Sequence, residues 1–152
     1  MKTSIIFLLI LLTSPCFASE PQTNWSTQDT VLQLAFVSLL ELDREQTVWS
    51  SKHPYTYEYT VTQIPNGVAF NKYSISHTES NPIIGNNASV GKINGYFASV
   101  AIVHTAISYG LRKSGWNLFG VPLVTIWQGV NIGIEGVVVG RNISVGTKFS
   151  FN

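Results

Sequence analysis

The stretch TIWQGVNIGIEGVVVGRN, Thr125–Asn142, sets polar residues and glycines at regular intervals in an apolar background. When the stretch is wound as a helix, its polar side chains share one face. This polar face consists of Gln128, Asn131, Glu135 and Asn142. The glycines lie on nearly the opposite side, in two pairs whose spacing allows a neighbouring helix to approach closely. This glycine face consists of Gly129, Gly133, Gly136 and Gly140. The pattern predicts a helix with two protein-contacting faces and a lipid-facing flank between them.

Two apolar segments near the carboxyl end are long enough to cross about 30 Å of hydrocarbon at 1.5 Å per residue. Residues 93–111 contain His104 as their one potentially charged side chain, and residues 118–140 contain Glu135. Their connection carries Arg112 and Lys113, which by the positive-inside tendency places it on the cytoplasmic side. We therefore expect a transmembrane helical hairpin of residues 93–111 and 118–142.

The first residues, MKTSIIFLLILLTSPCFASE, combine a lysine, an apolar run and small residues, as an export signal does. Cleavage after Ala18 would make residues 1–18 a signal peptide and leave 19–152 as one exported domain. The alternative is that Cys16, the one cysteine of the chain, becomes a lipid anchor.

Residues 26–47 have apolar side chains at helical spacing behind Ser26, a potential N-cap, and predict an amphipathic helix. This helix would pack against the membrane helices or lie at the surface. Residues 55–76 alternate in the period of a strand on both sides of a turn and predict a β-hairpin. The hairpin is either a solvated decoration or an aromatic surface for a partner. His53 and His77 are interpreted as surface residues.

The composition favours a membrane or membrane-apposed protein, because 45% of the residues are hydrophobic and 11% are charged. The net charge of +1 provides no field that would attract a polyanion, so nucleic acid is not an expected partner. The sequence contains no HExxH or GxSxG motif and no paired cysteines.

Charged side chains inside a membrane are costly and are often functional. His104 lies on the small, polar side of its segment, and Asp43 and Gln46 continue the apolar face of residues 26–47. One hypothesis is that Asp43, His104 and Glu135 converge into a metal or acid–base site. Assisting side chains would be Gln46, Gln128, Asn131 and Asn142. The alternative is a set of interhelical hydrogen bonds, with Glu135 neutral or paired with Arg112, Arg141 or His104. No metal is assigned, and the cofactor stays unknown.

The pattern WSTQDT, LDREQT, NPIIG, His104, Glu135 and NIS resembles a family of small exported helical proteins from bacteria and their prophages, whose activity is uncharacterised. The resemblance implies a bacterial or phage setting and carries over no activity.

The expected fold is a mainly α, membrane-associated helical bundle with an inserted β-hairpin. The expected place is the bacterial inner membrane, with most polar segments on the periplasmic side. The leading functional hypothesis is a non-enzymatic envelope protein that associates with itself or with another membrane protein through the glycine face. The rival hypothesis is an intramembrane or interfacial enzyme, or an ion-binding protein, that uses Asp43, His104 and Glu135.

Overall fold

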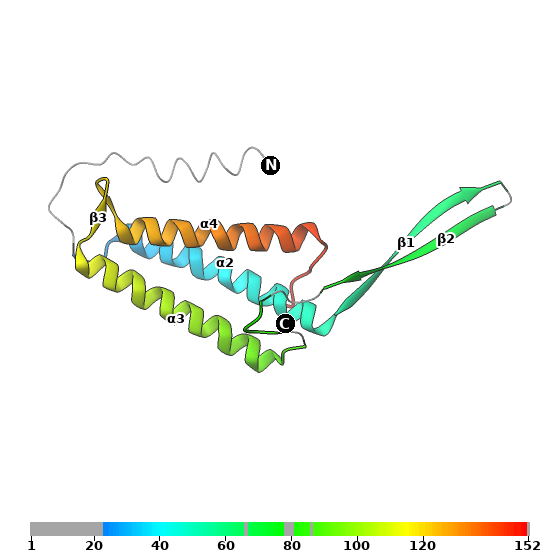
Figure 1. Cartoon of the computed structure of the whole chain (residues 1–152), viewed down its shortest axis with the longest axis horizontal. Helices are drawn as coiled ribbons and strands as arrows, with labels where there is room; N and C mark the ends of the chain where they lie inside the picture. The colour runs from blue at the N-terminus through cyan, green and yellow to red at the C-terminus, as the bar shows by residue number, and fades with distance from the viewer. Residues whose placement is uncertain (1–22, 66, 78–80, 86, 152) are drawn as a thin grey trace.

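The computed structural model describes residues 23–65, 67–77, 81–85 and 87–151. In this part of the chain three helices run side by side and a long hairpin projects from one end of them (Figure 1). The helices are α2 (Thr27–Lys52), α3 (Val90–Ser114) and α4 (Leu123–Ser144), and the hairpin consists of β1 (Tyr55–Ile64) and β2 (Gly67–Ser76). The prediction of a mainly helical chain with an inserted β-hairpin is confirmed. The predicted signal peptide, including Cys16, lies outside the described residues.

α2 begins at a complete capping box. The Ser26 hydroxyl accepts a hydrogen bond from the Asp29 backbone N–H, and the Asp29 carboxylate accepts one from the Ser26 backbone N–H. These bonds satisfy backbone donors that a helix start leaves unpaired. The helix continues to Lys52, past the end expected near residue 47, and stops before Pro54.

The connection between α3 and α4 differs from the prediction. Residues 118–122 do not belong to the last helix but to a small antiparallel turn of β3 (Asn117–Leu118) and β4 (Val121–Pro122). Phe119 and Gly120 at its tip both have positive φ, as in the tight turns that join antiparallel strands. α4 then starts directly after Pro122, whose ring presets a backbone angle suited to entering a helix.

An aromatic cluster fixes the base of the hairpin to α2. Trp49, in the last turns of α2, stacks on His53 with ring centroids 4.7 Å apart and meets His77 edge-on at 5.0 Å. The His77 backbone N–H also donates to the Pro54 carbonyl. His77 is 8% exposed, so its interpretation as a surface residue is wrong. The strand pattern of β2 ends just before His77 and does not indicate whether this side chain is buried. Its burial follows from its packing on Trp49.

The apolar core lies in the half of the bundle nearer the hairpin. Its members come from α2, α3 and the segment between the hairpin and α3: Phe36, Leu40, Val48, Ile84, Ile93 and Phe97. Phe36 also stacks on the His104 ring at 3.7 Å between centroids. The core therefore ends where a set of buried polar side chains begins, toward the β3–β4 turn.

Large apolar side chains are exposed along the middle of each helix. Exposed side chains include Val31, Leu34 and Val37 on α2, Ile102, Val103 and Ile107 on α3, and Val130, Ile134 and Val137 on α4. The interior between the same helices holds Asp29, Gln46, His104, Ser108, Arg112 and Gln128. Buried polar groups and exposed large apolar groups are the informative departures from ordinary burial, and here both occur on the same helices.

Of the described helices, α4 is the one that is long and apolar enough to cross a membrane, a property that core helices of soluble proteins also have. α3, the other predicted membrane-spanning helix, is not apolar enough to meet the same criterion. The reason is that α3 is two-sided: its inward face carries His104, Ser108 and Arg112, which lower the average over the whole helix although its outward face is apolar.

Candidate binding site at the foot of the hairpin

A cavity of about 590 Å³ lies where the end of α2, the base of the hairpin, the start of α3 and the end of α4 meet. Its polar lining comes from several elements: Asp43, Thr47, Ser50, Ser76, His77, Asn81, Glu135, Arg141, Asn142 and Thr147. Its apolar lining consists of Leu40, Pro82, Ile84, Tyr96, Phe97, Val100, Val138 and Val145. We call it the hairpin-foot cavity.

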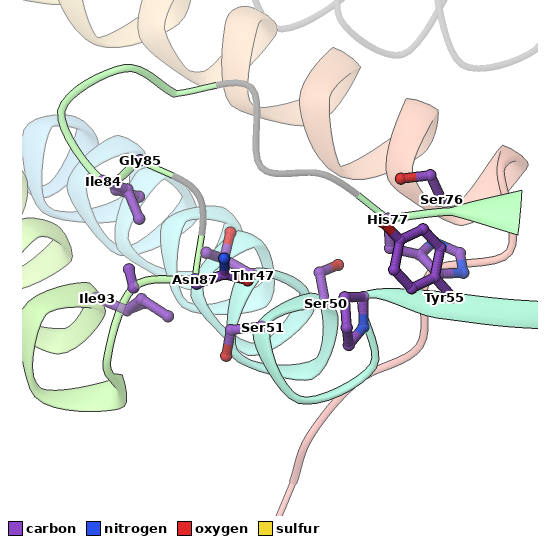
Figure 2. A pocket seen from close by; sticks show the side chains of 12 residues that line it. Thr47, Ser50, Ser51, Tyr55, Ser76, His77, Ile84, Gly85, Asn87 and Ile93 are labelled. Carbon is purple, nitrogen blue, oxygen red and sulfur yellow. The ribbon is translucent and has the colours of Figure 1, made fainter.

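A second chamber of about 310 Å³ adjoins this cavity and shares Thr47, Ser50, Ser76, His77 and Ile84 with it. Figure 2 shows Ser50 and Ser51 projecting from the last turns of α2, Tyr55 and His77 at the base of the hairpin, and Ile84 and Ile93 on the other side. The chamber is lined mainly by hydroxyl and apolar groups, so the charged side chains lie on the side of the larger cavity.

Asp43 is held in the cavity wall by its neighbours. The Asn142 side-chain N–H₂ donates to the Asp43 carboxylate at 3.0 Å and to the Gln46 side-chain carbonyl at 3.1 Å. Gln46, fully buried, in turn donates to the backbone carbonyl of Val139 at 3.4 Å. These bonds join the end of α2 to the end of α4 and orient the Asp43 carboxylate.

Glu135 lies one to two turns deeper on α4 and is partly buried. Its Oε2 atom is buried and receives no hydrogen bond from any described residue. Arg141 lines the cavity from the last turn of α4, and no salt bridge joins it to the described part of the chain. A carboxylate oxygen without a donor is costly to bury, so Glu135 has unused capacity to accept a hydrogen bond.

The pKa of His77 makes the anchor of the hairpin sensitive to pH. Burial, together with the nearby imidazole of His53, lowers the pKa of His77 below its ordinary value of 6.5. The folded chain therefore takes up a proton here less readily than the unfolded chain. The stability that this difference contributes is present above about pH 6.5 and is lost as the pH falls toward the lowered pKa.

We expect the thermal unfolding midpoint of the purified protein, followed by tryptophan fluorescence, to fall between pH 7.5 and pH 5. The variant His77→Phe keeps a ring against Trp49 but has no proton to bind, and its midpoint should depend less on pH over this interval. Retention of the full pH dependence in His77→Phe would show that another group is responsible.

A second polar cluster lies at the opposite end of the bundle, next to the β3–β4 turn. Arg112, 5% exposed, forms a salt bridge with Asp29, 0% exposed, with 2.5 Å between the guanidinium nitrogen and the carboxylate oxygen. Gln128 donates to the Asp29 backbone carbonyl at 3.2 Å. The Asp29–Arg112 salt bridge thus connects the start of α2 to the end of α3. The hydrogen bond from Gln128 connects the start of α4 to the same place.

His104 belongs to this second cluster. Its Nδ1 lies 3.1 Å from the Gln33 side-chain carbonyl, and Gln33 in turn donates to the Thr105 hydroxyl at 2.9 Å. The His104 ring also lies parallel to the Trp127 ring, with 5.6 Å between centroids. These contacts place His104 toward the β3–β4 turn, on the far side of Phe36 from the hairpin-foot cavity.

Asp43, His104 and Glu135 do not come together as metal ligands, contrary to the hypothesis. Asp43 and Glu135 line one cavity, whereas His104 lies in the other cluster. Among the described residues, no three histidine, cysteine, aspartate or glutamate side chains are close enough to hold a metal ion. The physical reason is the core between the two clusters, where aromatic and aliphatic side chains fill the interior.

The other predicted residues are divided between the clusters and the helix surface. Asn142 lines the hairpin-foot cavity and donates a hydrogen bond to Gln46 behind it. Gln128 belongs to the second cluster, and Asn131 donates to the Trp127 carbonyl of its own helix. On the glycine face, a Cβ at Gly136 would lie 4.0 Å from Leu39, whereas at Gly133 and Gly140 it would meet no described atom within 4 Å.

Two residues of the second cluster were missing from the prediction: Asp29 and Gln33. A signal for Asp29 exists in the sequence. It lies in the first turn of one helix, and Arg112 lies in the last turn of another. If a bundle places those two helix ends next to each other, the carboxylate of Asp29 and the guanidinium of Arg112 become neighbours. For Gln33 no comparable signal is present.

No protein-family model, no curated protein and no solved structure matches the chain.

Proposed function

We propose that this chain is a non-enzymatic membrane protein of the bacterial envelope, whose helices lie together in the bilayer and which acts by associating with itself or with another membrane protein through α4. The observation that carries the proposal is the reversed distribution of polarity: charged and amide side chains lie between the helices and large aliphatic side chains cover their outside. In water this arrangement would expose apolar surface and bury costly groups, whereas in lipid it is the favoured one.

The dimensions support this placement. On α3 the stretch between Lys92 and Arg112 contains no Asp, Glu, Lys or Arg, and it rises about 30 Å, the thickness of a typical hydrocarbon core. At the hairpin end, Arg44 forms salt bridges with Glu41 and Glu45. The hydrogen bond from Arg44 lowers the pKa of Glu41. Glu41 and Arg44 therefore both stay charged, as expected for side chains outside the lipid.

Aromatic side chains gather at the other end of the bundle. Trp116, directly before β3, and Phe119, at the tip of the β3–β4 turn, are exposed, and the Trp25 ring lies 6.4 Å from the ring of Tyr109. Tryptophan and tyrosine are enriched where a membrane protein crosses the lipid–water boundary. With Lys113 beside them, these residues fit the cytoplasmic boundary, and the hairpin then projects into the periplasm.

The glycine face supports association. Because a Cβ at Gly133 or Gly140 would meet no described atom, α2 and α3 leave this side of α4 open. Small residues on an open helix face in a membrane allow close packing of a partner helix. Gly136, next to Leu39 of α2, marks the edge of this open surface.

Membrane integration and orientation are tested together in cells that express the full chain. We expect the protein to stay in the membrane fraction after alkaline carbonate washing and to be released by detergent. In a Cys16→Ser background, an impermeant maleimide added to the periplasmic side should label Glu58→Cys in the hairpin and leave Lys113→Cys unlabelled. Release by carbonate would contradict the membrane placement, and labelling of Lys113→Cys alone would contradict the orientation.

A further inference from the structure

The lining of the hairpin-foot cavity is chemically mixed. It includes the carboxyl groups of Asp43 and Glu135, which come from different helices, α2 and α4. It also includes apolar side chains, among them the rings of Tyr96 and Phe97, which meet edge-on with 5.3 Å between centroids. A ligand that fills the cavity must therefore combine a charged or polar end with an apolar body.

The ionisable groups of the lining favour a cation. Among the described residues the lining holds two carboxyl groups, Asp43 and Glu135, and one guanidinium, Arg141. Asp43 accepts a hydrogen bond from Asn142. Glu135 has a buried oxygen that no described residue donates to, so this oxygen can accept a hydrogen bond from a ligand N–H group.

A bare metal ion does not suit this cavity. No group of three suitable ligands is present among the described residues, and much of the lining is aliphatic or aromatic, where an ion would lose its hydration without replacement. A protonated alkylamine needs fewer polar partners, because the apolar part of the lining stabilises its aliphatic chain.

We propose that the hairpin-foot cavity binds a primary alkylammonium, with its nitrogen donating to Glu135 and Asp43 and its aliphatic part against Tyr96 and Phe97. The same chemistry is present in a free aliphatic amine and in the ethanolamine headgroup of a phospholipid. In the second case Arg141 would face the phosphate. This site goes beyond the proposed association and does not depend on the glycine face.

The test is calorimetric titration of the purified full chain in a neutral maltoside detergent at pH 7, with the titration of empty micelles subtracted. The probes are n-octylamine, octyltrimethylammonium, octyl glucoside and dodecylphosphoethanolamine. We expect octylamine to bind at least about tenfold more tightly than octyltrimethylammonium, which has no N–H to donate, and than octyl glucoside, which has no charge.

Glu135→Gln keeps the shape of the side chain and removes its charge, so it should weaken octylamine binding by at least about tenfold, consistent with loss of a charge-assisted hydrogen bond. Glu58→Gln is the matched control, because Glu58 is exposed on the hairpin, and it should leave binding unchanged. Equal binding of octylamine and octyl glucoside, or equal binding to wild type and Glu135→Gln, would overturn the proposal.

A second measurement needs no variant that might fail to fold. A water-soluble carbodiimide should couple bound octylamine to a carboxyl of the wild-type protein, and mass spectrometry should locate the new amide at Glu135 or Asp43. Coupling confined to the exposed Glu41 and Glu58 would contradict the site. Binding of dodecylphosphoethanolamine that is tighter than that of octylamine by more than its four additional methylene groups provide identifies a lipid headgroup as the source, and the reverse order identifies a free amine.

Discussion

Replacing Arg112 with alanine is expected to destabilise the folded protein by about 3 to 5 kcal/mol, the cost of breaking a buried ion pair by removing one partner. Asp29 is 0% exposed and would be left in the interior without its cation. The same carboxylate is part of the capping box that starts α2, so its displacement also weakens that helix. The free energy of unfolding, measured by denaturing-detergent titration of the purified protein in mixed micelles, checks this value.

Lys113→Ala is the matched control, because Lys113 is the next residue on α3 and is exposed. It should change the unfolding free energy by no more than about 0.5 kcal/mol, as is usual for surface substitutions. The double variant Asp29→Asn, Arg112→Met removes both charges and should be more stable than Arg112→Ala alone. If Arg112→Ala costs no more than Lys113→Ala, the salt bridge does not hold the helix ends together.

The second large effect is expected from Gly133→Leu, which should abolish association while leaving the fold intact. Within one chain a Cβ at position 133 would meet no described atom within 4 Å, so we expect the leucine to fit without displacing α2 or α3. In an assembly it would occupy the volume that a partner helix needs for close backbone approach. Chemical cross-linking in membranes should therefore show at least a tenfold loss of the dimer or mixed complex.

Ile134→Leu provides the control, because Ile134 is 57% exposed on the same helix, outside the glycine face, and leucine there keeps an aliphatic side chain of the same size. Cross-linking of this variant should equal that of the wild type. An undiminished complex in Gly133→Leu, with unchanged unfolding, would remove the glycine face as the association surface and leave the membrane placement standing.

Local features of the sequence were sufficient to predict the elements. The helix at 26–47 was predicted from Ser26 and the apolar spacing, and the hairpin from the alternation in 55–76. The two-faced helix was predicted from the glycine and polar faces of 125–142. All of these signals depend on neighbours a few positions away. Boundaries were less certain where a turn competes with a helix. Phe119 adopts a positive φ that no pattern of apolar residues indicates, and the predicted helix 118–142 therefore starts too early.

The sequence by itself determined which side chains share a face of each helix, because that follows from 3.6 residues per turn. Only the tertiary structure decided which faces meet and at what level along the bundle. Asp43 and Glu135 line one cavity, whereas His104 was separated from them by the packing of Phe36 between the two polar clusters. The offset between helices depends on how distant side chains interlock and on how the connections close, and no local periodicity contains that information.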